Sequence, residues 1–160
     1  MAELRVVSRA AAAVLAGVAL WAGCGGDDEP AMSVEEYRAE AGAICRAATR
    51  AGARVGAPDA GNEGYARFLE RLVQVNAKPR AELAALEPPE ELRKAHDDLL
   101  AANDDGIEVT RRIIARLERG ESRKRIFRPE DAGGEILENA RRRDDAARRL
   151  GVPDCASPRR

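Results

Sequence analysis

Four polar residues have types and a spacing that suit ligand binding. His96, Asn103 and Thr110 follow one another at intervals of seven, which places them on one face of a helix. Asn76 lies among the apolar residues of another predicted helix. Such side chains donate and accept hydrogen bonds, so a line of them inside a helical domain is compatible with a small-ligand or metal site. Alternatively, these residues set the register of packed helices, or they lie at the solvent-exposed edge of an apolar stripe.

The sequence offers little for catalysis. His96 is the only histidine, and a catalytic histidine needs a nucleophile or a carboxylate held beside it. There is no Gly-x-Ser-x-Gly elbow, no Cys-x-x-Cys-His motif and no second histidine for the paired Glu-x-x-His ligands of a di-metal bundle. We therefore expect neither enzymatic activity nor a cofactor, assign no metal ligand, and expect His96 on the surface of its helix.

Residues 1–24 have the character of an export signal. Arg5 and Arg9 precede an uncharged, mostly apolar run over residues 10–22. This run is shorter than the roughly 20 apolar residues of a typical transmembrane helix. Its length matches the hydrophobic region of a secretory signal peptide. It ends in Trp21-Ala22-Gly23-Cys24. This ending resembles the lipobox of bacterial lipoproteins, a family that usually has leucine where this chain has Trp21.

The resemblance implies that Cys24 receives a diacylglycerol, that residues 1–23 are removed as a signal peptide, and that residues 24–32 form a flexible tether. Acyl chains would then anchor the protein to the cell membrane on its extracytoplasmic side. The chain is similar in its general features to small helical lipoproteins of high-GC Gram-positive bacteria. The alternatives are an uncleaved N-terminal helix and a secreted protein without a lipid.

The chain has three cysteines. With Cys24 acylated, Cys45 and Cys155 remain, and outside the cytoplasm such a pair can oxidise and persist as a disulfide. We predict this bond, which would join the first helix to the segment after the last one. The alternative is two unrelated buried thiols.

The charge is distributed unevenly along the chain. Residues 24–119 carry 14 basic and 19 acidic side chains, whereas residues 120–160 carry 11 basic and 8 acidic ones. The basic part either packs beside the acidic helices or contacts anionic lipid or cell-wall polymer. Because no nucleic-acid-binding motif accompanies it, the expected partners are the membrane, envelope proteins or anionic polymers.

Helical periodicity dominates residues 33–155. Ser33 and Glu36 fit a capping box for a first helix that runs to about residue 55. A second helix begins at Asn62 as its cap and ends before the proline pair at 88–89, and Pro79 is expected to kink it rather than split it. The third helix covers residues 89–119.

A fourth helix is predicted from Pro129 to residue 150, after a basic connector over residues 121–127. The glycine pair at 133–134 is expected to weaken its start, and Gly151 to cap its end. Its apolar stripe is thin: Ile136, Leu137, Ala140, Ala147 and Leu150. No segment alternates as a strand does. The expected fold is therefore all-α, an antiparallel four-helix bundle over residues 33–155 closed by the disulfide, with a tail at 156–160.

Two functions remain open. The first is a membrane-anchored, non-enzymatic interaction or structural domain of the cell envelope, which requires an exposed apolar or basic patch. The alternative is a carrier of a small ligand or metal, which requires His96, Asn103 and Thr110 to converge on one cavity.

Overall fold

The computed structural model describes residues 32–157, and these residues form helices and no strand. The all-α prediction is therefore confirmed. The predicted signal peptide, Cys24 and most of the tether lie outside the described residues. No helix within residues 32–157 is long and apolar enough to cross a membrane. The elements are α1 (Val34–Ala53), α2 (Gly61–Ala84), α3 (Glu90–Glu118), α4 (Arg123–Ile126), α5 (Ala132–Leu150) and the 3₁₀ helix η1 (Pro153–Cys155).

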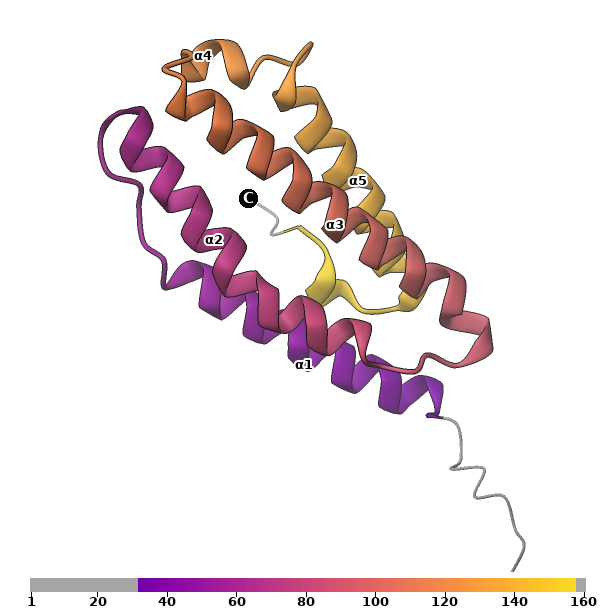
Figure 1. The fold of residues 1–160 in the computed structure, drawn as a ribbon. Coiled ribbons are helices and arrows are strands. Elements are labelled where there is room, and N and C mark those ends of the chain that lie inside the picture. Colours follow the sequence, from indigo (N-terminus) through magenta and orange to yellow (C-terminus); the bar gives the residue numbers. More distant parts are fainter. Residues whose placement is uncertain (1–31, 158–160) are drawn as a thin grey trace, which may run out of the picture.

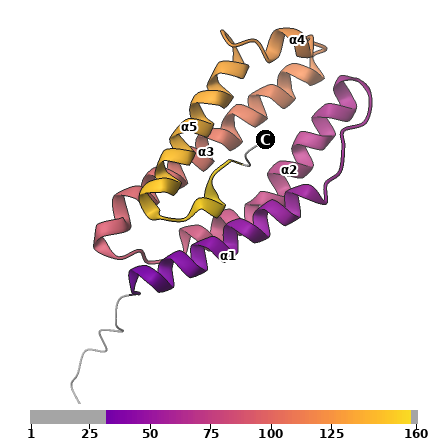
Figure 2. The same cartoon turned by 180° about the vertical axis from the view of Figure 1, so that it is seen from behind.

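The long helices pack in the order of the chain. α1 packs against α2, α2 against α3, and α3 against α5, while η1 packs against both α1 and α5. Figures 1 and 2 show that the start of α1, the α2–α3 link and the end of α5 lie at one end of the molecule. The α1–α2 link and α4 lie at the other end.

The start of α1 follows the predicted capping box. The Ser33 hydroxyl accepts from the Glu36 N–H at 3.2 Å, and the Glu36 carboxylate accepts from the Ser33 N–H at 2.9 Å. Two otherwise unpaired backbone donors are satisfied in this way. The helix then turns Tyr37 and Ala41 into the core.

The second helix differs from the prediction at its start. Pro79 lies inside a continuous α2, so the helix is not split. Its N-cap is Ala60 and not Asn62. The Asn62 side-chain amide instead donates to the backbone oxygen of Glu121 at 2.7 Å. Asn62 therefore ties the start of α2 to the α3–α4 link, a tertiary contact that a local capping pattern cannot reveal.

The predicted basic connector contains a short helix, α4, and its Ile126 is fully buried. The following helix starts later than expected, because Asp131 is its N-cap and accepts from the Ala132 N–H at 2.8 Å. Asp131 also accepts from the Arg116 Nη2 at 2.7 Å, and these bonds, led by that to Arg116, lower its pKa to about 2. The ion pair with α3 thus fixes where α5 begins.

The inward face of α5 was predicted correctly in part, since Ala147 and Leu150 are buried as expected. Ile136 and Leu137, in contrast, are 40% and 53% exposed. Ala132, Asn139 and Ala146 are the buried positions that the predicted stripe lacked. The packing of α5 on α3 turns polar Asn139 inward, and a stripe chosen from apolar residues alone misses that orientation.

The glycine pair at the start of α5 serves a close approach rather than flexibility. A Cβ atom on Gly134 would lie 2.1 Å from the carbonyl oxygen of Pro129. That distance is well inside van der Waals contact, so only glycine fits this turn without a backbone shift.

Candidate functional site

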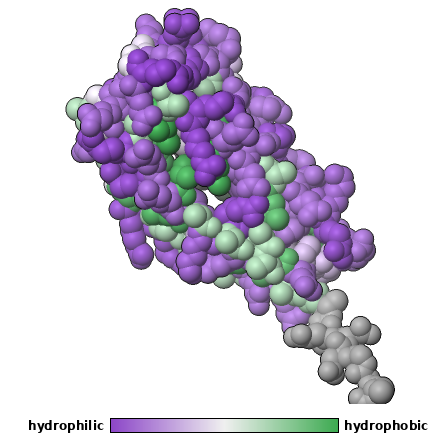
Figure 3. Space-filling model, in the orientation of Figure 1, coloured by the Kyte–Doolittle hydropathy of each residue, from purple (hydrophilic) through white to green (hydrophobic). Residues whose placement is uncertain are grey.

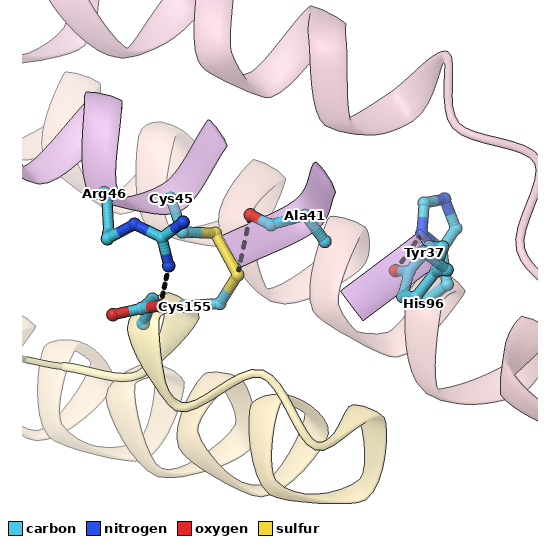
Figure 4. The surroundings of a disulfide bond; sticks show 7 residues. Tyr37, Ala41, Cys45, Arg46, His96 and Cys155 are labelled. Carbon is cyan, nitrogen blue, oxygen red and sulfur yellow. Dashed lines mark hydrogen bonds and ion pairs between the residues drawn. A yellow bond between two sulfur atoms is a disulfide. The ribbon is translucent and has the colours of Figure 1, made fainter. Parts of the chain in front are cut away.

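The predicted disulfide is present. Cys45 on α1 and Cys155 in η1 are bonded, with their Cα atoms 5.0 Å apart (Figure 4). The adjacent Arg46 and Asp154 form an ion pair across the same contact. These links hold the segment that follows α5 against α1, so the chain after Leu150 forms one wall of the space described next.

The core consists of two separate apolar clusters. One includes Tyr37, Leu99 and Leu150 near the start of α1, and the other includes Val109, Ile113 and Ile126 towards α4. Between them lies a cavity of about 650 Å³, lined by α1, α2, α3, α5 and the segment around Cys155. Its walls are mainly apolar, and Figure 3 shows apolar side chains in a hollow between α2 and α3, framed by polar residues.

The cavity exists because the middles of α3 and α5 carry small or polar side chains where a core would carry large apolar ones. Asn103, Gly106 and Thr110 face it from α3, and Asn139 and Ala140 face it from α5. Protein interiors are normally close-packed. A space of this size lies within the range of small-molecule sites, about 300–1,000 Å³.

Three of the four polar residues singled out in the sequence line this cavity: Asn76, Asn103 and Thr110. The Asn76 amide donates to its own helix, to the Leu72 backbone oxygen at 2.7 Å. The Thr110 hydroxyl likewise donates to the Gly106 backbone oxygen at 2.8 Å. Asn103 makes no side-chain hydrogen bond within residues 32–157. Its amide is therefore the member of the set with the largest unused capacity for a ligand.

His96 does not line the cavity, and its expected surface position is wrong. The residue is 3% exposed, and its Nδ1 lies 2.8 Å from the Tyr37 hydroxyl. Burial lowers the pKa of His96 and raises that of Tyr37 to about 12. The imidazole is thus held neutral and hydrogen-bonded inside the core, where it joins α1 to α3 (Figure 4).

Sequence reasoning missed Asn139 and Arg143, which line the cavity from α5. Arg143 stands in a run of three arginines, and its type alone does not distinguish it from its neighbours. The helical phase does carry a signal, because Asn139 and Arg143 lie 11 and 7 residues before buried Leu150, at the spacing of one helix face.

The charges at the α2 wall are compensated. Arg80 donates from Nε and Nη2 to the two carboxylate oxygens of Asp104, at 2.7 and 2.5 Å. These hydrogen bonds lower the pKa of Asp104, so it remains ionised beside the guanidinium. Asp154, which lines the cavity from η1, is paired with Arg46.

Within the described residues, no group of three or more histidine, cysteine or acidic side chains is arranged to hold a metal ion. The arrangement instead suits the binding of an apolar small molecule that makes a few hydrogen bonds with the polar residues of the cavity wall. Comparisons with protein-family models, with curated proteins and with solved structures found no match to this chain.

Proposed function

We propose that this protein is a lipid-anchored, extracytoplasmic binding protein that carries a small, mainly apolar ligand in the cavity between its helices. The observation that carries the proposal is the interruption of the core. Asn76, Asn103 and Thr110 border a space of about 650 Å³ whose remaining lining is mainly apolar. A ligand that fills this space would supply the van der Waals contacts that the two clusters do not make with each other.

The location is a separate part of the proposal. It rests on the lipobox-like sequence Trp21-Ala22-Gly23-Cys24. The Cys45–Cys155 disulfide fits an oxidising compartment. We propose no enzymatic step and no cofactor, since the cavity holds no histidine beside a nucleophile or carboxylate.

We also propose that the four long helices form an antiparallel bundle. The sequential packing of α1 on α2, α2 on α3 and α3 on α5 supports this arrangement. In this bundle η1 and the disulfide would lie between the first helix, α1, and the last, α5. The cavity extends to that side, where Cys155 lines it.

Binding of Nile red, a neutral apolar dye, tests the proposed function. We expect saturable binding of one dye per chain, measured as fluorescence enhancement. Ala48→Phe should weaken that binding by about tenfold or more, because Ala48 lines the cavity and a phenyl ring would occupy it. Ala43→Phe is the matched control, since Ala43 lies on the same helix and is exposed. Non-saturable binding, or equal effects of the two variants, would contradict a cavity site.

A second candidate is the envelope interaction domain. It is favoured by the exposed basic residues Arg123, Lys124 and Arg125 of α4. This helix lies at the opposite end of the molecule from the start of α1, so an anchor preceding α1 would leave the basic end facing away from the membrane (Figure 1). Co-sedimentation with an insoluble anionic polymer should then be lost when all three residues are changed to glutamine. Retention by that variant would rule out this candidate.

A further inference from the structure

The two cationic side chains that line the cavity, Arg80 and Arg143, differ in their partners. Arg143 lines the cavity from α5, and its Nε is buried without a hydrogen-bond partner among the described residues. A buried donor that lacks a partner costs free energy comparable to a lost hydrogen bond, and more when the group is charged. Such an atom in a native structure therefore calls for an explanation.

The protein does not neutralise Arg143 as it neutralises the other arginine at the cavity. Arg80 has both oxygens of Asp104 at hydrogen-bond distance. Arg143 has no carboxylate oxygen within 4.0 Å among residues 32–157. Its Nη2 donates to the neutral hydroxyl of Ser157 at 2.6 Å.

The neighbouring carboxylate, Asp144, acts on Arg143 through its charge but forms no ion pair with it within 4.0 Å. Asp144 accepts from the backbone N–H of Ser157 at 2.6 Å, which holds the segment after η1 against α5. Arg143 thus presents a positive charge to the cavity, and Asn139 stands one helical turn before it on the same wall.

We propose that the ligand is an amphipathic anion, with an apolar chain in the cavity and a carboxylate or phosphate group bound by Arg143. This assignment rests on the proposed carrier function and adds the chemical class of the ligand. The mainly apolar lining suits the chain, and the guanidinium suits an oxyanion, with which it forms short, charge-assisted hydrogen bonds. An oxyanion at the cavity face of Arg143 would give the guanidinium the charge-assisted partner that no carboxylate within 4.0 Å provides among residues 32–157.

The test compares probes that share a chain and differ in the head group: dodecanoate, dodecyl phosphate and the neutral 1-dodecanol. Calorimetric titrations use the full chain with Cys24→Ser, so that no acyl group competes for the site. We expect at least one anion to bind about tenfold or more tightly than dodecanol, the usual effect of a hydrogen bond to a charged group. Dodecanoate and dodecyl phosphate compared with each other show whether the site prefers a carboxylate or a phosphate.

Arg143→Gln should remove the preference for the anions and leave dodecanol binding unchanged, while Arg143→Lys should keep part of the preference. Arg141→Gln is the matched control, because Arg141 is an exposed arginine of the same run that pairs with Glu138 at 3.7 Å and does not line the cavity. Ser157→Ala separates the anion contact from the structural bond to Ser157, and it should retain the preference.

The outcomes distinguish the two proposals. If dodecanol and the anions bind equally to the unaltered site, or if Arg141→Gln acts as strongly as Arg143→Gln, the anion assignment is overturned and the carrier function stands. If none of the three probes binds, and Nile red also fails, the carrier function itself is overturned.

Discussion

Tyr37 and His96 meet in the core, with the phenol oxygen of α1 2.8 Å from Nδ1 of the imidazole of α3. Both residues are buried, and their rings lie edge to face with centroids 5.8 Å apart. A buried polar pair of this kind is stable only while both groups are neutral and bonded to each other. The contact therefore makes the fold sensitive to protonation.

The first prediction concerns acid. Burial is the main cause that lowers the pKa of His96 below its ordinary value of 6.5, with Asp97 opposing the shift and Arg80 adding to it. Well above pH 6.5 the ring is neutral in both the folded and the unfolded state, and the shift has no effect on stability. Below it, the unfolded chain takes up the proton first, so stability falls as the pH decreases toward the folded-state pKa. Thermal melts at about pH 7.5 and pH 5 should detect this loss.

The matched variant for that experiment is His96→Asn, which can still bond to Tyr37 and does not titrate. The unaltered protein should lose a few degrees more in Tm between the two pH values than the variant does. Acidic side chains titrate in both proteins and cancel in the comparison. Equal losses would show that His96 does not control the acid response.

The second prediction concerns the disulfide. Cys45 and Cys155 are 110 residues apart in sequence, and a covalent link across a loop of that length restricts the unfolded chain. Replacing both by serine should lower the free energy of unfolding by about 4–5 kcal/mol in the chain-entropy model. Urea denaturation measures the loss. Cys24→Ser is the control, because it removes a cysteine other than the bonded pair, and it should unfold as the unaltered protein does.

The third prediction contrasts two helical glycines. A Cβ on Gly134 would meet the Pro129 carbonyl oxygen at 2.1 Å, whereas one on Gly52 would have Leu72 Cδ2 as its nearest contact, at 4.0 Å. Gly134→Ala should destabilise the fold by roughly 1–3 kcal/mol through overpacking. Gly52→Ala should stabilise it by up to about 1 kcal/mol, the difference in helix propensity. If urea denaturation finds the two changes equivalent, the close approach at α5 is not restrictive.

The sequence predicted what local rules determine. The capping box at Ser33, the continuity of α2 through Pro79 and the pairing of Cys45 with Cys155 depend on short-range patterns or on cysteine count, and all three are present. The exposure of Leu137 and the burial of His96 depend instead on how helices far apart in sequence are rotated against one another. Hydrophobicity alone did not reveal that rotation.

The same distinction explains the candidate site. Asn76, Asn103 and Thr110 were found because polar residues beside apolar stripes are visible in sequence, and they line one cavity. Arg143 was missed because arginine is common in this chain and is usually solvated. It is distinguished by its position at the cavity and by an Nε that has no hydrogen-bond partner among residues 32–157.

The last prediction concerns location. If Cys24 carries acyl chains, their burial in the bilayer contributes about 0.8 kcal/mol per methylene, enough for two or more chains to hold the protein stably. Cys24→Ser should therefore move the protein from the membrane fraction to the soluble fraction of cells, as measured by quantitative immunoblotting. The double variant Cys45→Ser, Cys155→Ser is the control for loss of cysteine. Its lower stability will reduce the amount of protein, but the protein that remains should be in the membrane fraction. An unchanged distribution of Cys24→Ser, together with an intact mass of the unaltered protein that shows no acyl group, would exclude a lipid anchor at this residue. The cavity and its ligand class would remain open to the binding experiments.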